Sequence, residues 1–555
     1  MGYLEIKNLS FQYAGTDKPV LNNVSFSVEQ GAFILLCGAS GSGKSTLLKL
    51  LKPQLTPSGQ QTGDIYLENE TIMALPEPFS SSNIGYVMQK PENQMVTENV
   101  WHELAFGLEN LGVSTSEIKS RIAEMVHFLG IQELLDYKTS ELSGGQKQLL
   151  NLASVLVMKP EILLLDEPTT QLDPIASQKF IDLLVRLNRE MGVTILLAEH
   201  HLESVFASAD KVLILEKGEL LFAGKPKMIS KLINTNRQEL SRFSVSLPSA
   251  VQIYLGSGIM DDCPLTVVEG KRFLARHFPI VADFREEKTA SISRQIGIEL
   301  KNCWFRYEKQ GPDIVAGVDF QVYEGEIFTL VGGNGTGKTT LLKVIAGIKK
   351  CYRGKVSILN QPIKKAQDTV GYLPQEPEML FIKDSIIEEY TDHLERINVN
   401  KTEQTKRIND ITNLLDLNDV LTKHPLDLSG GEIQRAALGK VLLADAKVLL
   451  LDEPTKGIDN YAKKQLIYLL KKLSKQGKTI LLVTHDLDFA AELSDRCGLF
   501  FQNNVLSVAA PKQFFSQHAF YTTAASRISR VSFHDLVTTD QVITACNSKK
   551  GAIHE

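Results

Sequence analysis

The residues Gly38-Ala39-Ser40-Gly41-Ser42-Gly43-Lys44-Ser45 decide the fold of this chain, because the same pattern returns as Gly332-Gly333-Asn334-Gly335-Thr336-Gly337-Lys338-Thr339. Both stretches match Gly-x-x-x-x-Gly-Lys-[Ser/Thr], in which backbone N–H groups and the start of a helix surround phosphate groups. The lysine of this pattern pairs with phosphate oxygens, and the hydroxyl residue binds Mg²⁺. Each copy follows an apolar run, so the sequence predicts two phosphate-binding loops between a buried strand and a helix.

Two further motifs follow each loop in the same order. Leu-Ser-Gly-Gly occurs at 142–145 and 428–431, and Leu-Leu-Asp-Glu-Pro at 164–168 and 450–454. The aspartates of the second motif end apolar runs, where a carboxylate can hold Mg²⁺ through water, and the adjacent glutamates are placed to orient or deprotonate an attacking water. The residues concerned are Asp166, Glu167, Asp452 and Glu453. The duplication therefore predicts two metal-assisted phosphate-hydrolysis sites.

The repeat divides the chain. Its copies cover residues 1–226 and 295–512, and in each copy apolar strands alternate with helical stretches, which indicates an α/β fold with a mostly parallel sheet. The connector 227–294 carries two apolar patches and is expected to be a small folded element. The tail 513–555 has few large apolar residues, so we expect a loosely packed C-terminal extension.

Composition excludes several classes of protein. A chain of 555 residues is too long for one core and predicts several domains. The formal net charge of −5 gives no support to nucleic acid as the main partner. Six scattered cysteines without a Cys-x-x-Cys pair are typical of reduced thiols, not of a zinc or iron–sulfur site. No signal peptide and no run of 18 apolar residues is evident, so work at a membrane would require another subunit.

With these motifs, both halves resemble the nucleotide-binding domains of the ATP-binding cassette (ABC) family over about four-fifths of the chain. The resemblance implies two P-loop ABC domains in tandem, each with a mostly parallel sheet core, an antiparallel β subdomain and a helical subdomain. Leu142-Ser143-Gly144-Gly145-Gln146 and Leu428-Ser429-Gly430-Gly431-Glu432 match the family's signature motif. In that family the signature serine and glycines cap the γ-phosphate bound to the opposite domain, which fits the positive end of a helix.

Further residues are carried over from the family by position. Gln89 and Gln375 resemble the glutamines that sense Mg²⁺ and the coupled subunit, and His200 and His485 match the switch histidine at the end of a strand. The remaining matches are the adenine-stacking aromatics Tyr13 and Tyr307, whose simple packing in a strand is the alternative interpretation.

The family's geometry gives two composite sites for ATP and Mg²⁺, each completed by the signature motif of the other half. The implied ATP ligands are Gly38, Ser40, Gly41, Gly43, Lys44, Ser45, Thr46 and Tyr13, closed by Ser429, Gly430 and Gly431; and Gly332, Asn334, Gly335, Gly337, Lys338, Thr339, Thr340 and Tyr307, closed by Ser143, Gly144 and Gly145. The implied Mg²⁺ ligands are Ser45, Gln89, Asp166, Thr339, Gln375 and Asp452. The implied catalytic residues are Glu167, Glu453, His200 and His485.

Because both halves retain the glutamate and the histidine, both are expected to hydrolyse ATP. The halves differ in the signature helix, where Arg435 corresponds to Leu149, and in the loop after Asp-Glu-Pro, which reads Gln171-Leu172-Asp173 or Gly457-Ile458-Asp459. These differences put equal rates in doubt.

The segment Gln89-Lys90-Pro91-Glu92-Asn93-Gln94, followed by residues 103–112, resembles ATPases of the energy-coupling factor type, which power uptake of vitamins and transition metals. That resemblance implies a bacterial protein on the cytoplasmic face of the membrane, held there by a transmembrane coupling subunit that works on a membrane substrate-binding subunit. The sequence does not identify the transported substrate, and it leaves open thiamine precursors, other vitamins, cobalt and nickel.

A soluble tandem ABC ATPase acting on ribosomes or nucleic acid is the alternative. Such proteins have a long basic helical connector, whereas residues 227–294 contain Pro248, Gly256, Gly258 and Pro264 and are nearly balanced in charge. The sequence therefore favours the uptake ATPase, with no nucleic-acid partner.

Overall fold

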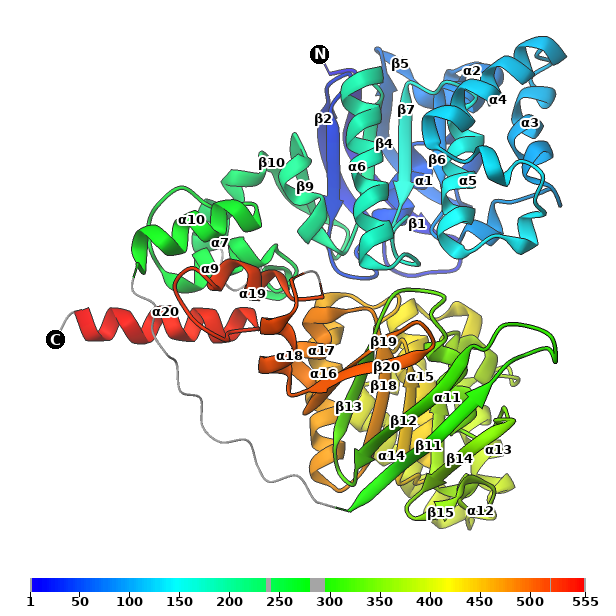
Figure 1. Cartoon of the computed structure of the whole chain (residues 1–555). Helices are drawn as coiled ribbons and strands as arrows, with labels where there is room; N and C mark the ends of the chain where they lie inside the picture. Colours follow the sequence, from blue (N-terminus) through cyan, green and yellow to red (C-terminus); the bar gives the residue numbers. More distant parts are fainter. Residues whose placement is uncertain (1, 236–240, 280–294, 520, 554–555) are drawn as a thin grey trace. The chain divides into compact units, whose positions relative to one another are not determined.

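The computed structural model describes residues 2–235, 241–279, 295–519 and 521–553. The chain forms two compact units, Met1–Pro248 and Ser249–Glu555, which are treated separately below. Each unit contains one copy of the repeat, with an antiparallel sheet, a six-stranded mostly parallel sheet and flanking helices (Figure 1). The predicted α/β class, with a parallel core, an antiparallel β subdomain and a helical subdomain in each half, is therefore confirmed.

The first unit is built on two sheets. The antiparallel sheet has the order β2-β1-β4-β5, and the six-stranded sheet has the order β10-β9-β3-β8-β7-β6, with only β10 antiparallel to its neighbour. The strands are β1 (Leu4–Tyr13), β2 (Leu21–Val28), β3 (Phe33–Cys37), β4 (Gly59–Leu67), β5 (Glu70–Thr71), β6 (Ile84–Val87), β7 (Ile162–Asp166), β8 (Thr194–Ala198), β9 (Lys211–Glu216) and β10 (Glu219–Gly224). The helices are α1 (Lys44–Leu50), α2 (Glu77–Asn83), α3 (Val100–Asn110), α4 (Thr115–Leu129), α5 (Gly144–Leu156), α6 (Pro174–Met191), α7 (Ile229–Thr235) and α8 (Ser241–Ser244).

The second unit repeats this plan, with sheet orders β12-β11-β14-β15 and β16-β17-β18-β13-β19-β20. Its strands are β11 (Ile296–Phe305), β12 (Val315–Tyr323), β13 (Ile327–Val331), β14 (Arg353–Ile358), β15 (Gln361–Pro362), β16 (Val370–Leu373), β17 (Val448–Asp452), β18 (Thr479–Thr484), β19 (Arg496–Phe501) and β20 (Asn504–Ala509). Its helices are α9 (Ser249–Ser257), α10 (Val267–His277), α11 (Lys338–Ile345), α12 (Ile363–Ala366), α13 (Ile386–Arg396), α14 (Lys401–Leu415), α15 (Gly430–Leu443), α16 (Asn460–Lys475), α17 (Leu487–Leu493), α18 (Pro511–Gln517), α19 (Ala524–Ser529) and α20 (Thr539–Ile553).

The central strands place the functional loops. Every residue of β3, β7 and β8 is buried, as are those of β13, β17 and β18, because these parallel strands are covered on both faces. Their side chains are accordingly mostly apolar. These strands are parallel, so their carboxyl ends meet at one edge of the sheet. The loops that follow them carry the repeated motifs, and ligands of open α/β sheets bind at this edge.

The tail differs from the loosely packed extension expected from the sequence. Val542, Ala545 and Cys546 of α20 are fully buried, α20 packs against α9, and α19 packs against α10. Small side chains allow helices to pack closely, so a segment poor in large apolar residues can still be buried. The connector helices α9 and α10 thus form one helical element of the second unit with the tail helices α19 and α20 (Figure 1).

Within this element, α10 and α20 begin in the same way. In α10 the Thr266 hydroxyl accepts from Glu269 N, while Glu269 accepts from Leu265 N at 2.7 Å. Before α20, Thr538 and Gln541 make the equivalent pair of bonds, with Gln541 accepting from Val537 N at 2.9 Å. These hydrogen bonds satisfy backbone N–H groups at the start of α10 and of α20 and fix the first turn of each helix.

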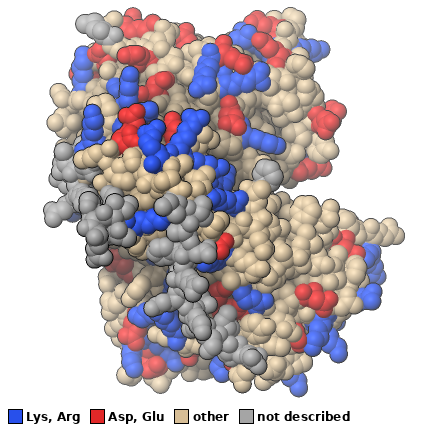
Figure 2. Space-filling model, turned by 60° about the vertical axis from the view of Figure 1, so that its left-hand side comes forward, with Lys and Arg blue, Asp and Glu red and all other residues tan. Residues whose placement is uncertain are grey.

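Charged side chains of both signs are distributed over the surface. Lysine and arginine lie among aspartate and glutamate on the face shown in Figure 2, in keeping with the formal net charge of −5. No helix among the described residues is both long enough and apolar enough to cross a bilayer.

Candidate functional site

Both predicted phosphate-binding loops lie between a buried strand and a helix, as the sequence requires. In the first unit α1 begins at Lys44, whose Nζ donates to the carbonyls of Gly38 and Ala39 at 3.0 and 3.1 Å. Gly43 has φ 103°, and a Cβ built on it would approach Leu21 Cδ2 to 2.7 Å. A residue with a side chain cannot replace this glycine without strain. The loop is therefore shaped by its glycines around the lysine.

The second loop has the same construction. Lys338 Nζ donates to the carbonyls of Gly332 and Gly333 at 2.9 and 2.8 Å. Gly337 precedes α11 with φ 107°. The remaining predicted phosphate ligands lie in the same two loops or first helical turns; these are Ser40, Gly41, Ser45 and Thr46, and Asn334, Gly335, Thr339 and Thr340. Backbone N–H groups at a helix start provide the donors that a phosphate needs, so both loops fit one.

A hydroxyl and a carboxylate meet beside each loop. Ser45 Oγ donates to Asp166 Oδ1 at 2.9 Å, and Thr339 Oγ1 donates to Asp452 Oδ1 at 3.0 Å. Burial raises the pKa of Asp166, and it raises the pKa of Asp452 to about 6. A hydroxyl next to a carboxylate is a donor set of the kind that Mg²⁺ prefers, and a cation would offset the cost of burying the charge. The residues present therefore fit a magnesium ion.

A tyrosine in each unit contacts the same carboxylate but was not predicted. Tyr86 on β6 and Tyr372 on β16 donate to Asp166 Oδ2 and Asp452 Oδ2, both at 3.2 Å. Each stands three residues before the predicted glutamine, so its position within the repeat was the available signal. These tyrosines orient the carboxylates toward the loops.

Glu167 is the centre of the first site. His200 Nε2 lies 2.5 Å from its Oε1, and Lys44 Nζ lies 3.7 Å from the same oxygen. Gln89 Nε2 donates to Oε2 at 2.9 Å. Burial opposes ionisation of Glu167, but the attraction of His200 and Lys44 outweighs the effect of burial and lowers the pKa of Glu167 to about 2. The backbone of Glu167 is left-handed (φ 47°), a strain found at functional positions.

The second site has the same pair in a different arrangement. Glu453 is also left-handed (φ 50°), and His485 approaches its Oε2 with Nδ1, at 2.9 Å. This approach is an ion pair and not an aligned hydrogen bond. Burial opposes the charge of both groups, yet their attraction prevails, because the pKa of Glu453 is lowered and that of His485 is raised. Gln375 is exposed, and no hydrogen bond joins it to Glu453 within the described segments.

A second buried carboxylate belongs to the first site alone. Glu199 is 1% exposed and stands between β8 and His200. It accepts from Thr169 N and Oγ1 and from His200 N. Thr484 occupies the equivalent position in the second unit, 3.4 Å from Thr455 Oγ1. Nothing in the sequence marked Glu199 as part of the site, because its role depends on burial beside Thr169.

Each signature motif begins a helix. Ser143 and Ser429 cap α5 and α15. The hydroxyl of each serine accepts a hydrogen bond from the backbone N–H three residues later, and the backbone N–H of the serine donates to the side chain of that later residue. The glycines that follow, Gly144 and Gly145 or Gly430 and Gly431, form the first turn. A Cβ on Gly430 would lie 2.8 Å from Gly457 O, so this turn approaches the loop after Asp-Glu-Pro. The pairing of each motif with the other unit stays a prediction.

The predicted adenine-stacking tyrosines lie next to the loops. Tyr13 OH is 2.9 Å from Thr46 Oγ1, and Tyr307 OH is 3.1 Å from Thr340 Oγ1. Tyr13 ends β1, an inner strand of its sheet, and Tyr307 follows the end of β11. Tyr307 is 56% exposed. Both rings also pack edge-on against a phenylalanine, Tyr13 on Phe11 and Tyr307 on Phe305, so stacking on adenine stays a prediction.

The family model for the ABC transporter matches residues 21–170 and 315–456, which include both loops, both signature motifs and both Asp-Glu-Pro motifs. The chain belongs to the ABC transporter ATP-binding family. It is accordingly an ATPase with two ABC domains in one chain. The site geometry described above is thus that of a duplicated ABC ATPase.

Full-length relatives share this organisation. An ABC transporter ATP-binding protein of Bacillus anthracis is 41% identical over 99% of both chains. A protein of Bacillus subtilis named for HMP/thiamine import is 30% identical and covers 93% of this chain and 92% of its own. Among solved structures, cbiO1 of Clostridium perfringens, described as part of the ABC transporter complex cbiONQ, is 26% identical over 40% of this chain and 92% of its own, with a TM-score of 0.38.

Proposed function

We propose that this chain is the ATP-hydrolysing subunit of an importer of the energy-coupling factor type, which takes up a vitamin, a vitamin precursor or a transition metal ion. It works at the cytoplasmic face of a bacterial membrane with a transmembrane coupling subunit and a membrane substrate-binding subunit. The observation that carries the proposal is the exposure of large apolar side chains in the segment after the predicted glutamine, above all in the second unit. The segment after Gln89, typical of that transporter type, and the HMP/thiamine import named for the Bacillus subtilis relative support it.

The exposed surface follows β6 and β16. Val96 is 66% exposed in the first unit, and Met379 and Ile382 are 72% and 80% exposed in the second. Large apolar side chains gathered on a surface mark an interaction site. A helix of a membrane subunit, itself apolar on one face, would cover such residues next to Gln89 and Gln375.

The site residues take the following roles in this proposal. ATP would supply the electrophilic γ-phosphoryl group, and a bound Mg²⁺ would offset the negative charge of the phosphate oxygens. Lys44 and Lys338 hold phosphate oxygens, while Ser45 with Asp166 and Thr339 with Asp452 hold the metal. Glu167, ionised because of its low pKa, accepts the hydrogen bond of the attacking water and positions it, with His200 fixing its carboxylate. Glu453 and His485 do the same in the second site.

Two sites arise because each signature helix completes the loop of the other unit. Ser143 and Ser429 already present capped helix starts, whose N–H groups and dipole favour the γ-phosphate. Closure of the two units around ATP would draw the helices of the coupling subunit together, and hydrolysis would release them.

Affinity purification of the tagged chain from detergent-solubilised membranes tests the proposal. We expect co-purification of one multi-span membrane protein with a small membrane protein. The double variant Met379→Asp, Ile382→Asp should lose both, whereas Met260→Asp, at an 86% exposed side chain in the connector, should retain them. Co-sedimentation with ribosomes instead of membranes would refute the proposal, as would equal recovery with the double variant.

The substrate is tested separately, with cells that lack the chain. Uptake of labelled HMP and thiamine is measured first, followed by other vitamins, cobalt and nickel. We expect one of these to require the chain and its Glu167 and Glu453 carboxylates. Unchanged uptake of all of them would contradict the proposed substrate classes.

A further inference from the structure

The second unit contains a cavity of about 410 Å³ beside its signature helix. It lies between the end of α14, the first half of α15, and α16, with the end of β16 at its base. Its apolar wall is formed largely by leucines, namely Leu373, Leu415, Leu438, Leu451, Leu466 and Leu469. Pockets of this size and character hold small organic molecules.

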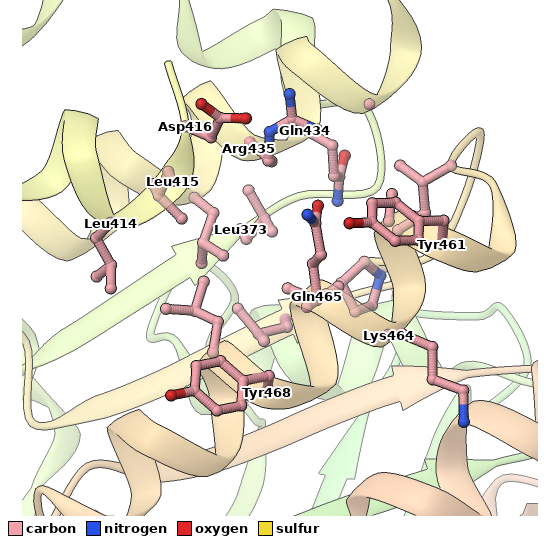
Figure 3. Close-up of a pocket in the computed structure, with 18 of the residues that line it drawn as sticks. Leu373, Leu414, Leu415, Asp416, Gln434, Arg435, Tyr461, Lys464, Gln465 and Tyr468 are labelled. Carbon is pink, nitrogen blue, oxygen red and sulfur yellow. The ribbon is translucent and has the colours of Figure 1, made fainter. Parts of the chain in front are cut away.

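Two buried donors of this cavity have no partner. Gln434 is 5% exposed, and its Nε2 makes no hydrogen bond. Arg435 Nε is also buried without a partner. Figure 3 shows the amides of Gln434 and Gln465 and the hydroxyl of Tyr461 turned toward one another inside the cavity. An unpaired buried donor has lost its hydrogen bonds to water without replacement, so a ligand that brings an acceptor would be favoured.

The charged residues that line the cavity determine whether it favours an anionic or a cationic ligand. The charged residues that line the cavity are Arg435, Lys464, Lys472 and Asp416. Lys464 is committed elsewhere, because its Nζ donates to Glu492 and Asp540 at 2.8 and 3.0 Å, and Figure 3 shows it pointing away from the cavity. The remaining two cations and one carboxylate favour an anion.

The mouth of the cavity is aromatic. Tyr461 and Tyr468 lie two turns apart on α16 and are 38% and 74% exposed. Flat aromatic molecules pack on such rings through offset or edge contacts. We propose that this cavity is a regulatory site for an aromatic organic acid, whose acidic group accepts from Gln434 and Arg435 while its rings lie between the leucines and the tyrosines.

The first unit repeats the buried glutamine, as Gln148, whose amide also has no partner, but it does not repeat the cationic and aromatic side chains. Aligning the signature and Asp-Glu-Pro motifs places Leu149, Ile175 and Asp182 at the positions of Arg435, Tyr461 and Tyr468. The anion-binding donor and both aromatic rings are therefore replaced, one of them by a carboxylate. The site is specific to the second unit and provides its own internal control.

The ligand would act on the signature motif through Arg435. A Cβ built on Gly431 would lie 3.7 Å from Arg435 Nη1, so the guanidinium extends over the first turn of α15. A carboxylate or sulfonate in the cavity would draw this positive charge away from the turn that, under the proposed function, caps a γ-phosphate. Binding should therefore lower ATP hydrolysis, a step that rests on the proposed function.

Calorimetric titration of the full chain without nucleotide tests the site directly, with 8-anilinonaphthalene-1-sulfonate as the anionic probe and N-phenyl-1-naphthylamine as its neutral analogue. We expect one saturable site for the anion and binding of the neutral analogue weaker by about tenfold or more, since a charge-assisted hydrogen bond contributes about 1.5–3 kcal/mol. Arg435→Leu and Tyr468→Asp introduce the side chains found in the first unit. Each should weaken binding of the anion by a similar factor. Asp182→Asn should leave it unchanged.

Thermal unfolding of each variant verifies folding, and Tyr468→Asp changes only an exposed side chain. The proposal is overturned if both variants bind the anion as the unaltered chain does, if the neutral analogue binds equally well, or if binding is weak and multiple. It is also overturned if saturating anion leaves ATP hydrolysis unchanged. Because binding is read without ATP, loss of binding is distinguishable from a failure of the proposed function.

Discussion

The buried carboxylate of Glu199 makes the stability of the first unit depend on pH near neutrality. Glu199 is 1% exposed. Burial raises its pKa from 4.5 to about 7, although hydrogen bonds from Thr169 oppose the shift. A shift of this size corresponds to about 3 kcal/mol between the low-pH and high-pH limits. Ionisation of the Glu199 carboxylate therefore destabilises the folded state above pH 7.

The sign of the effect follows from proton binding. Between pH 4.5 and 7 the folded chain keeps a proton on Glu199 that the unfolded chain has lost. Because the folded state binds more protons in this window, its stability falls as pH rises and levels off above pH 7. The stability that Glu199 contributes at low pH is lost as the pH passes through the folded pKa.

Glu199→Thr removes the carboxylate and introduces the residue found at this position in the second unit, Thr484. The free energy of unfolding is measured by urea titration of both proteins at pH 5 and pH 8. The difference between variant and unaltered chain should shift in favour of the variant by about 2.5 kcal/mol from pH 5 to pH 8, because pH 5 already lies above the unfolded pKa. Titrating groups that do not interact with Glu199 cancel in this difference, whereas Glu167 and His200 interact with it.

Thr484→Glu is the matched test in the second unit. Because threonine does not titrate, this position now contributes no pH dependence to the free energy of unfolding, and the new carboxylate should introduce one similar to that of Glu199. A difference between variant and unaltered chain that stays constant within about 0.5 kcal/mol from pH 5 to pH 8 would refute the reasoning for Glu199.

Three further changes test packing and nucleotide contact. Phe180→Ala, at a fully buried ring of α6, should lower the free energy of unfolding by about 3–5 kcal/mol in denaturant titration, and a loss below about 1 kcal/mol would contradict the packing described. Gly439→Ala would place a Cβ 2.2 Å from the Tyr390 hydroxyl and should cost about 1–3 kcal/mol by the same measurement; Tyr390→Phe should recover part of this loss, and no recovery would show that the clash lies elsewhere. Tyr307→Ala should weaken ATP binding at the second loop about tenfold in calorimetry while Tyr307→Phe preserves it, since ring stacking contributes about 1–3 kcal/mol, and equal affinities would refute adenine stacking.

The sequence predicts most of the framework because the framework is duplicated. Helices that begin at Lys44 and Lys338, and buried strands that end at Asp166 and Asp452, follow from motif order and apolar run length alone. Each of these features depends on residues close together in the chain. Two occurrences in one order make them certain in a way that a single motif would not.

The contacts that sequence reasoning missed depend on residues far apart. The Glu199 carboxylate is explained only by burial against Thr169, and Tyr86 by its reach to Asp166. The hydrogen bond from Gln89 to Glu167 is likewise invisible in the sequence, where Gln89 and the exposed Gln375 look equivalent. Tertiary packing, not local pattern, decides these features.

The packed tail has the same explanation. Residues such as Ala545 and Cys546 are small and gave no sign of a core, yet they are fully buried in α20, which packs on α9. Their burial depends on a connector more than 250 residues earlier in the chain. Small side chains become informative only when the facing helix is known.

Photolabelling with 8-azido-ATP tests the central claim, that each ATP site is completed by the signature motif of the other unit, and proteolysis then assigns the label to residues 1–248 or 249–555. Ser429→Arg should lower labelling of the first unit and leave the second unchanged, because its bulk and charge block a helix start that caps the opposite phosphate. Ser143→Arg should do the reverse. Loss of label in the same unit as the substitution would contradict the account.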